Sequence, residues 1–497
     1  MTDTTSETIQ KTSIALHQEV KDQLVRWEKM YDCFQDEYWI KSKSSLYLSI
    51  PSGISSKAPN TQTGLYDAYK KRSIYYRYLS SDINKMKSML TKKKVEFELP
   101  KKMLSLIEDA GQDGESLNTI VDTLFQNQLL YSRYGLLVDI PEKAKGMDVI
   151  PHLVEYGHNT IVNWVTDTVN GKEIPVVIIL DQSYDEITAG LQRKLVENYR
   201  ILALANYDTN PIYYSYETDS TGVNAFELNQ DIPEDAYIPN IREKTLPYIP
   251  FQICNALSLA FETEIPILIE IADMALALYQ GEADYRQSLF MQGQATPYVA
   301  GASSDLDKIA FGATALIKFT DTDAHGGFIE VEGKGLAGMK AGLDGLHAQE
   351  DKLGVSLIEA GANQSGEALG VRLGVQTASL VGVSNINKQC LKNVLKIIAD
   401  WMDENEEEIG LTYTTDFMNS QKSIDELIKL ADLTKENKYA LEDFYNYLKR
   451  NDYTAVNTFE EWKDKIQTEN GELIDEETQR IMDEIKAGEQ TETKAEE

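Results

Sequence analysis

Apolar residues recur at helical spacing in three long stretches of the second half of the chain, residues 264–292, 336–353 and 365–402. Each stretch is long enough to form an extended α-helix. Pro266 lies near the start of the first stretch, where proline suits the first turn. At 1.5 Å per residue this helix would span about 40 Å. Residues 293–335 are interrupted by glycine and predict a few short strands between the first two helices.

The first half of the chain mixes the two periodicities. Residues 8–38 and 65–90 predict helices, residues 49–64 predict a polar loop, and a further helix is capped near Asp113 or Ser116. Strands are predicted to follow one another without helices between them, which is typical of an antiparallel sheet. The expected fold class is therefore α+β. The predicted strands include GLLVDIP, TIVNWVTD, IPVVIILDQS, ILALANYDTNPIYYSYET and TGVNAFELNQ.

Residues 403–497 differ in composition from the rest of the chain. They begin with the acidic run DENEEE and then predict short polar helices, such as ALEDFYNYLKRN. The final residues, EQTETKAEE, have the composition of a disordered tail.

The charge balance restricts how the protein can interact with nucleic acid. The chain carries 80 acidic and 48 basic residues, for a net charge of −32. Tight binding to nucleic acid depends on lysine and arginine releasing counterions from phosphates, so this balance argues against a protein that grips it. Two interpretations of the negative charge stay open: it forms an acidic surface past which nucleic acid slides, or it simply keeps the protein soluble.

Apart from one glycine-rich motif, the sequence offers no recognisable catalytic or metal-binding pattern. Cys33, Cys254 and Cys390 lie far apart, which predicts free thiols in a reducing compartment and no zinc site. The five histidines show no ligand spacing, and neither a Walker A nor a G-x-S-x-G sequence is present. Arg133 beside the strand GLLVD suggests a structural ion pair with Asp139. The start MTDTTSETIQ lacks the features of a signal peptide, and no apolar run reaches membrane-spanning length, so we expect no membrane association.

One motif keeps an enzyme in consideration. The sequence GKGLAG at 333–338 matches G-x-G-x-x-G, follows the possible strand GFIEVE and opens a helix, with Glu359 about twenty residues further on. In a nucleotide-dependent oxidoreductase, Gly333, Gly335 and Gly338 would approach the cofactor phosphates. The sequence that follows is helical and lacks the further strand–helix units of such a fold.

Small residues recur every four positions in the last long helix. Each interior glycine costs roughly 0.5–1 kcal/mol relative to alanine. Four-residue spacing forms a slanted groove that lets another helix approach closely or lets the helix bend. The pattern therefore predicts close packing, either within the chain or between copies of it. The residues are Gly366, Gly370, Gly374, Ala378 and Gly382, with Gly338 and Gly342 in the preceding helix.

The order of these segments resembles that of the portal proteins of tailed bacteriophages. The resemblance covers roughly residues 65–417. It rests on DAGQDGESLNTIVDTLFQNQLLYSRYGLLVDIP, NTIVNW, LPYIPF, EIPILIEIADMALALYQGEADYRQSLFMQGQATPYVAG and GANQSGEALGVRLGVQTASLVGVSNINKQCLKNVLKIIADWM.

The resemblance implies a portal-type subunit with a wing, a two-helix stem, a small β-containing clip, a long kinked helix and a helical crown. Carried onto this chain, the parts are a wing at 1–263, a first stem helix at 264–292, a clip at 293–335, a second stem helix at 336–353, a tunnel loop at 354–364, the long helix at 365–402 and an acidic crown-like region at 403–497.

The resemblance also implies a function without catalysis or a cofactor. Portal subunits form a ring, usually dodecameric, at one vertex of the capsid, and double-stranded DNA is packaged and ejected through it. The implied partners are the terminase large subunit, the major capsid and scaffolding proteins and the head–tail connector proteins. The protein would be assembled in the host cytoplasm and become part of the virion. Asn363, Gln364 and Ser365 would face the moving DNA. A ring or scaffold unrelated to DNA is the third alternative.

Overall fold

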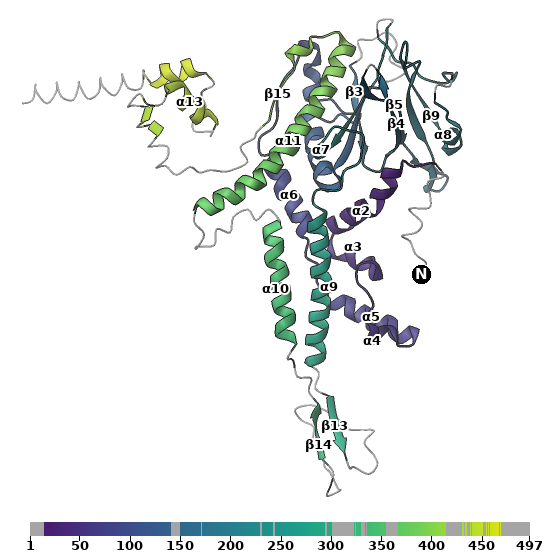
Figure 1. Ribbon diagram of the computed structural model, residues 1–497, viewed down its shortest axis with the longest axis vertical. Coiled ribbons are helices and arrows are strands. Elements are labelled where there is room, and N and C mark those ends of the chain that lie inside the picture. The colour runs from purple at the N-terminus through teal and green to yellow at the C-terminus, as the bar shows by residue number, and fades with distance from the viewer. Residues whose placement is uncertain are drawn as a thin grey trace, which may run out of the picture. The chain divides into compact units, whose positions relative to one another are not determined.

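The chain forms two compact units, Met1–Phe417 and Met418–Glu497 (Figure 1). The computed structural model describes residues 14–140, 150–169, 171–228, 231–241, 244–293, 296–300, 325–329, 335–353 and 366–413, with residues 323 and 333 and parts of 430–468.

The chain begins with a group of helices. Proline explains two of their starts, because Pro51 caps α4 and Pro59 lies in the first turn of α5. The loop predicted for 49–64 is therefore wrong. The single helix predicted for 65–90 is also wrong, because the backbone becomes extended at Ser73 and the buried Tyr75 hydroxyl donates a 2.7 Å hydrogen bond to the carbonyl of Cys33. The helices are α2 (Gln18–Phe34), α3 (Glu37–Ser42), α4 (Ser52–Ser55), α5 (Pro59–Arg72) and α6 (Tyr78–Leu90).

A buried helix and a three-stranded antiparallel sheet follow. Helix α7 (Leu117–Tyr131) begins after Ser116, whose side chain accepts a hydrogen bond from the Thr119 amide, as predicted. The sheet has the order β12-β2-β3 and contains β2 (Arg133–Asp139), β3 (His152–Gly157) and β12 (Phe251–Asn255). Gly135 is required in β2, because a Cβ there would lie 2.3 Å from the Phe251 ring.

A four-stranded antiparallel sheet has the order β4-β5-β8-β9. It confirms the predicted α+β class with consecutive antiparallel strands. The strand predicted in TGVNAFELNQ is wrong, because Asp219 accepts hydrogen bonds from the amides of Thr221 and Gly222 and starts the short helix α8. The elements are β4 (Ile161–Val169), β5 (Lys172–Asp181), β8 (Tyr199–Ala205), β9 (Ile212–Thr218) and α8 (Ser220–Ala225), with β6 (Tyr184–Thr188) and β7 (Gln192–Val196) inserted between β5 and β8.

Helices α9 (Ile269–Gln292) and α10 (Leu336–Leu353) lie side by side (Figure 1). The strands between them in sequence, β13 (Thr296–Ala300) and β14 (His325–Ile329), pair antiparallel and confirm that short strands occur in this region. Helix α11 (Gly366–Met402) then follows, and its bounds and those of α10 agree with the prediction.

Helix α9 begins at Ile269, five residues later than predicted. The residues before it are fixed by distant groups. The amide of Thr263 donates to the Glu19 carboxylate at 2.7 Å, and the amide of Ile267 donates to the Ser132 hydroxyl at 3.0 Å. Pro266 therefore precedes the helix rather than lying in its first turn.

The first compact unit extends beyond the end of α11. Strand β15 (Gly410–Thr412) pairs with β1 (Glu96–Glu98), so the chain after residue 402 returns to the helices near the N-terminus. The first unit accordingly includes this strand and extends to Phe417.

The second unit contains the predicted helix α13 (Leu441–Arg450). An aromatic cluster of Phe444, Tyr445, Phe459 and Trp462 forms its described interior. The predicted disordered tail lies outside the described residues.

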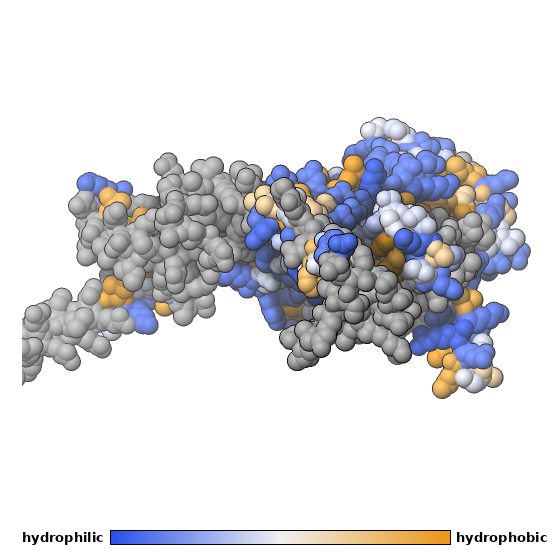
Figure 2. All heavy atoms as spheres, turned by 90° about the horizontal axis from the view of Figure 1, so that it is seen from below, coloured by the Kyte–Doolittle hydropathy of each residue, from blue (hydrophilic) through white to orange (hydrophobic). Residues whose placement is uncertain are grey.

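One large hydrophobic core joins the N-terminal helices, α7, the first sheet, the first half of α9 and the second half of α11. A smaller core lies against the four-stranded sheet and includes Ile14, Ile179 and Tyr214. The three cysteines are free, as predicted, and all three are buried. Hydrophilic residues cover much of the described surface in Figure 2, in line with the acidic composition.

Candidate assembly surface on helices α9 and α10

Helix α9 is anchored to the N-terminal helices by polar side chains. Tyr69 on α5 donates a 2.5 Å hydrogen bond to Asp284. Glu282, only 6% exposed, accepts from the Tyr76 hydroxyl at 3.3 Å and from Arg286 Nε at 2.7 Å. Burial, followed by the charge of Glu282, raises the pKa of Tyr76, so the phenol stays protonated and donates. These bonds fix both the position of α9 along its axis and its rotation about that axis.

Helix α10 rests on α9 through Leu343. The residue is 6% exposed, and a Cβ placed on Gly281 of α9 would lie 2.8 Å from its Cδ2 atom. Gly281 therefore provides the notch that receives the leucine, and any larger residue there would force the leucine to move.

A second contact holds α10 to α6. The hydroxyl of Tyr78 lies 2.6 Å from Nδ1 of His347, and the rings of Tyr76 and His347 meet edge to face with centroids 5.1 Å apart. Glu350, one turn further on, is also buried. Leu343, His347 and Glu350 follow helical spacing and define the packed side of α10.

The glycine side of α10 is uncovered in the part of the chain that the structure describes. Gly338, Gly342 and Gly345 are exposed, and a Cβ built on any of them would have no neighbouring atom within 4 Å. Because one residue advances about 100° around a helix, this side lies about 100° to 160° around the helix from Leu343. Another chain can reach it without displacing Leu343 or His347.

The structure describes the surroundings of only some of the small residues predicted along α11. Gly366, Gly370, Gly374 and Ala378 lie in α11 at four-residue intervals, and their surroundings are outside the described residues. Gly382 is half-buried, and a Cβ on it would also meet no described atom within 4 Å. The predicted tunnel loop, with Asn363, Gln364 and Ser365, lies outside the described residues.

Sequence reasoning missed a buried polar network at the C-terminal half of α11. Asn387 donates to the side-chain oxygen of Gln128 at 3.0 Å and accepts from the Tyr413 hydroxyl at 2.7 Å. Gln128 donates to the carbonyl of Asn255 at 2.8 Å, and Asn255 Nδ2 donates to the carbonyl of Ala260. The network connects α11 to the segment that leads into α9. The signal available in the sequence was Asn387, a polar residue at a helical position that the apolar spacing indicates to be buried.

The predicted ion pair between Arg133 and Asp139 is wrong. Six residues along a strand separate two side chains by about 20 Å. Arg133 is fully buried, donates to the carbonyl of Phe261 at 2.8 Å and lies over the Trp164 ring at 4.5 Å. Burial lowers its pKa to about 10. Asp139 instead accepts hydrogen bonds from the two terminal guanidinium nitrogens of Arg200, Nη1 and Nη2, at 2.5 and 3.0 Å.

The glycine motif at 333–338 has a structural context unlike that of a dinucleotide-binding turn. The preceding strand β14 pairs antiparallel with β13, and no parallel partner is found among the described residues near it. A Cβ on Gly333 would lie 1.9 Å from Nε2 of Gln292, so this glycine allows the chain to pass the end of α9. Glu359, the expected ribose-binding acid, lies outside the described residues.

Residues 267–402 match the model of a family described as a domain of unknown function (DUF4055). The matched segment includes all of α9, β13, β14, α10 and α11, and it covers less than a third of the chain. No curated protein matches the chain.

The described residues contain no helix with the length and apolar character needed to cross a membrane. Nor do they bring three histidine, cysteine, aspartate or glutamate side chains together in a way that would hold a metal ion.

Proposed function

We propose that the chain is a portal-type subunit, of which several copies form a ring at a capsid vertex. Double-stranded DNA would be packaged and ejected through this ring. The ring, for which we expect twelve copies by resemblance to the family, would dock the terminase large subunit during packaging and head–tail connector proteins afterwards. Capsid and scaffolding proteins would surround it in the virion.

The observation that carries this proposal is the uncovered glycine side of α10. A glycine in a helix interior costs roughly 0.5–1 kcal/mol, and within the described residues no intrachain contact offsets that cost at Gly338 or Gly342. Close packing of a neighbouring copy against this side would offset the cost. In a ring, such a contact is head to tail, and the rotation from one copy to the next brings the last copy back to the first.

The order of elements and the charge support the same proposal. Two long adjacent helices, α9 and α10, are separated in sequence by a segment that contains the antiparallel pair β13–β14, and they are followed by a third long helix, α11. The net charge of −32 suits a channel that must not hold its DNA, because few basic groups are available to displace counterions from phosphates.

Negative-stain electron microscopy of the purified chain, with rotational class averages, is the direct test. We expect rings with a central hole. Variants Gly338→Leu and Gly342→Leu place bulk on the open side of α10 and should abolish rings while the monomer stays folded, as judged by circular dichroism. Rings that form unchanged in both variants would contradict the role given to this side.

A second test concerns the passage of DNA. Replacing Gln364 and Ser365 with lysine adds charges that attract phosphates, so DNA packaging in an in vitro assay should slow. The matched control replaces the same residues with alanine. Packaging at an unchanged rate in the lysine variant would count against contact between this loop and DNA.

A further inference from the structure

Strands β6 and β7 continue the central pair of the four-stranded sheet outward as a two-stranded hairpin. Asp181 of β5 pairs with Tyr199 of β8, and the amide of Gln182 then donates to the carbonyl of Asn198 at 2.8 Å. The antiparallel register continues to the pair formed by Thr188 and Gln192.

Within the described part of the chain, both long edges of this hairpin are unpaired. The flanking strand β4 begins at Ile161, opposite Leu180, and the flanking strand β9 ends at Thr218, opposite Tyr199. Among the described residues, no strand pairs with the outer edge of β6 or β7. Unpaired edges are templates for another strand, and an isolated two-stranded ribbon is marginally stable in water.

The hairpin also exposes apolar side chains. Ile187 and Leu195 share one face, because their respective cross-strand partners, Arg193 and Asp185, lie on that face too. Leu191 at the turn is 85% exposed and has a φ of 58°, a left-handed conformation that leucine rarely adopts. The exposed fractions of Tyr184, Ile187 and Leu195 are 53%, 64% and 52%.

The two edges carry opposite charges. Strand β6 contains Asp185 and Glu186 with no basic residue, and β7 contains Arg193 and Lys194 with no acidic residue. The ion pair between Asp185 and Arg193 spans 3.6 Å, and both side chains are largely exposed, so water screens it. Pairing two copies through the same edge would oppose like charges, whereas pairing β6 of one copy with β7 of the next opposes unlike charges.

We infer that the β6–β7 hairpin joins copies of this chain head to tail, with the acidic edge of one copy against the basic edge of the next. In a ring, a rotation relates each hairpin to the next one, so β7 of one copy runs antiparallel to β6 of its neighbour. The two strands can then form antiparallel main-chain hydrogen bonds while both copies keep the same orientation. The exposed apolar side chains of neighbouring hairpins then lie next to one another on one continuous sheet. The inference rests on the proposed ring only in its need for a head-to-tail contact.

Charge reversal on the full-length chain tests this pairing. The first variant, Asp185→Lys/Glu186→Lys, makes both edges basic, and the second, Arg193→Glu/Lys194→Glu, makes both acidic. Each variant alone should associate at least tenfold more weakly than wild type in sedimentation velocity. A 1:1 mixture should restore association, because each edge then meets its opposite on the other variant.

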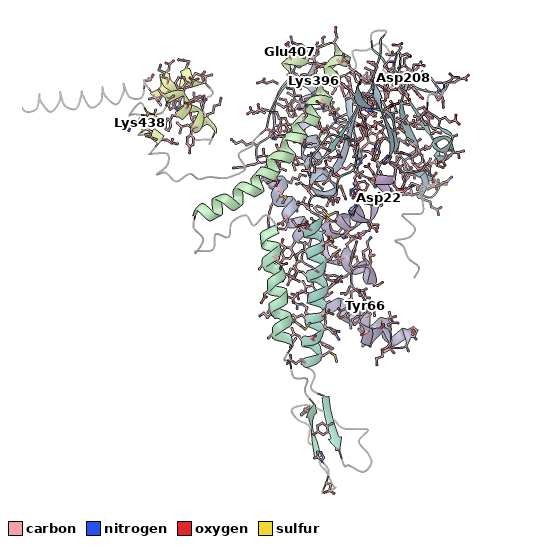
Figure 3. The ribbon with its side chains drawn as sticks, in the orientation of Figure 1. Asp22, Tyr66, Asp208, Lys396, Glu407 and Lys438 are labelled. Carbon is pink, nitrogen blue, oxygen red and sulfur yellow. The ribbon has the colours of Figure 1, made fainter. Side chains whose placement is uncertain are left out.

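The mixture separates pairing between copies from stability within the hairpin, since like charges still face each other inside every hairpin of both variants. Asp208→Lys, an exposed change in the β8–β9 turn (Figure 3), is the matched control and should associate like wild type. The inference is overturned if both variants associate like wild type, if the mixture stays monomeric, or if wild type itself stays monomeric at millimolar concentration.

This experiment distinguishes failure of the hairpin contact from failure of the proposed function. Rings with a central hole formed by both charge variants would remove the hairpin contact and leave the portal proposal standing. Recovery in the mixture, with assemblies that lack a central hole, would support the hairpin contact and count against the conduit.

Discussion

Two glycines on facing helices allow one substitution to be compared in opposite surroundings. Gly342 on α10 has no atom within 4 Å of a built Cβ, whereas the Cβ of an alanine at Gly281 on α9 would lie 2.8 Å from Leu343. Gly342→Ala and Gly281→Ala therefore add the same methyl group to the same kind of helix. We expect the two variants to shift the stability of the α9–α10 pair in opposite directions.

The magnitudes follow from the two environments. Gly342→Ala gains the helix propensity of alanine, roughly 0.5–1 kcal/mol. Gly281→Ala gains the same propensity but crowds a buried side chain, which typically costs about 1–3 kcal/mol. The net loss for Gly281→Ala is then up to about 2.5 kcal/mol. Because 1.4 kcal/mol corresponds to a factor of ten, amide exchange in α10 should slow about two- to fivefold in the first variant and accelerate by up to about sixtyfold in the second.

Hydrogen exchange with mass spectrometry, on peptides from 336–353 of the monomeric chain, measures these rates. Leu343→Ala supplies the control, because removing the leucine should make Gly281→Ala no longer destabilising. A shift of both glycine variants in the same direction, or a loss in Gly281→Ala that persists without the leucine, would refute the assignment of Gly281 as a notch and Gly342 as an open site.

Two further substitutions test the interior of the first unit. Asn387→Ala leaves the Tyr413 hydroxyl and the side-chain oxygen of Gln128 without their buried partner and should cost about 2–3 kcal/mol in a denaturant titration. The exposed Gln389→Ala should change stability little, and equal effects of the two substitutions would contradict the network. Burial, followed by a neighbouring carboxylate, raises the pKa of Glu155 from 4.5 to about 7. The contribution of its protonated form is therefore complete below pH 4.5 and lost as the pH rises through 7, so the melting temperature of wild type should fall over this window relative to that of Glu155→Gln; parallel curves would refute the shift.

Local signals predicted the long helices well. Helices α10 and α11 begin and end where periodicity and glycine placement indicate. Two errors also had local signals that were interpreted wrongly. Pro51 and Pro59 mark helix starts within the stretch predicted as a loop, and Asp219 caps the helix that was predicted as a strand.

Other errors have no local signal, because distant residues decide the outcome. The start of α9 depends on Glu19 and Ser132, both more than 100 residues away in sequence. Asp139 finds Arg200, 61 residues further on, and Arg133 is fixed by Trp164 from another strand. A sequence pattern gives the type of an element with more certainty than it gives the partner of a side chain.

The glycine spacing shows this limit at the candidate site. In sequence, Gly281 and Gly342 are both small residues inside long helices, yet one receives Leu343 of the same chain and the other has no such neighbour among the described residues. Spacing alone therefore does not separate intrachain packing from a surface left for another copy. The separation comes from the position of the packed side, because Leu343 and His347 hold α10 from about 100° and 140° around the helix relative to Gly342. A neighbouring chain that contacts Gly342 would therefore bury the open side while every bond that fixes α10 within its own subunit is kept, which is what the proposed ring needs.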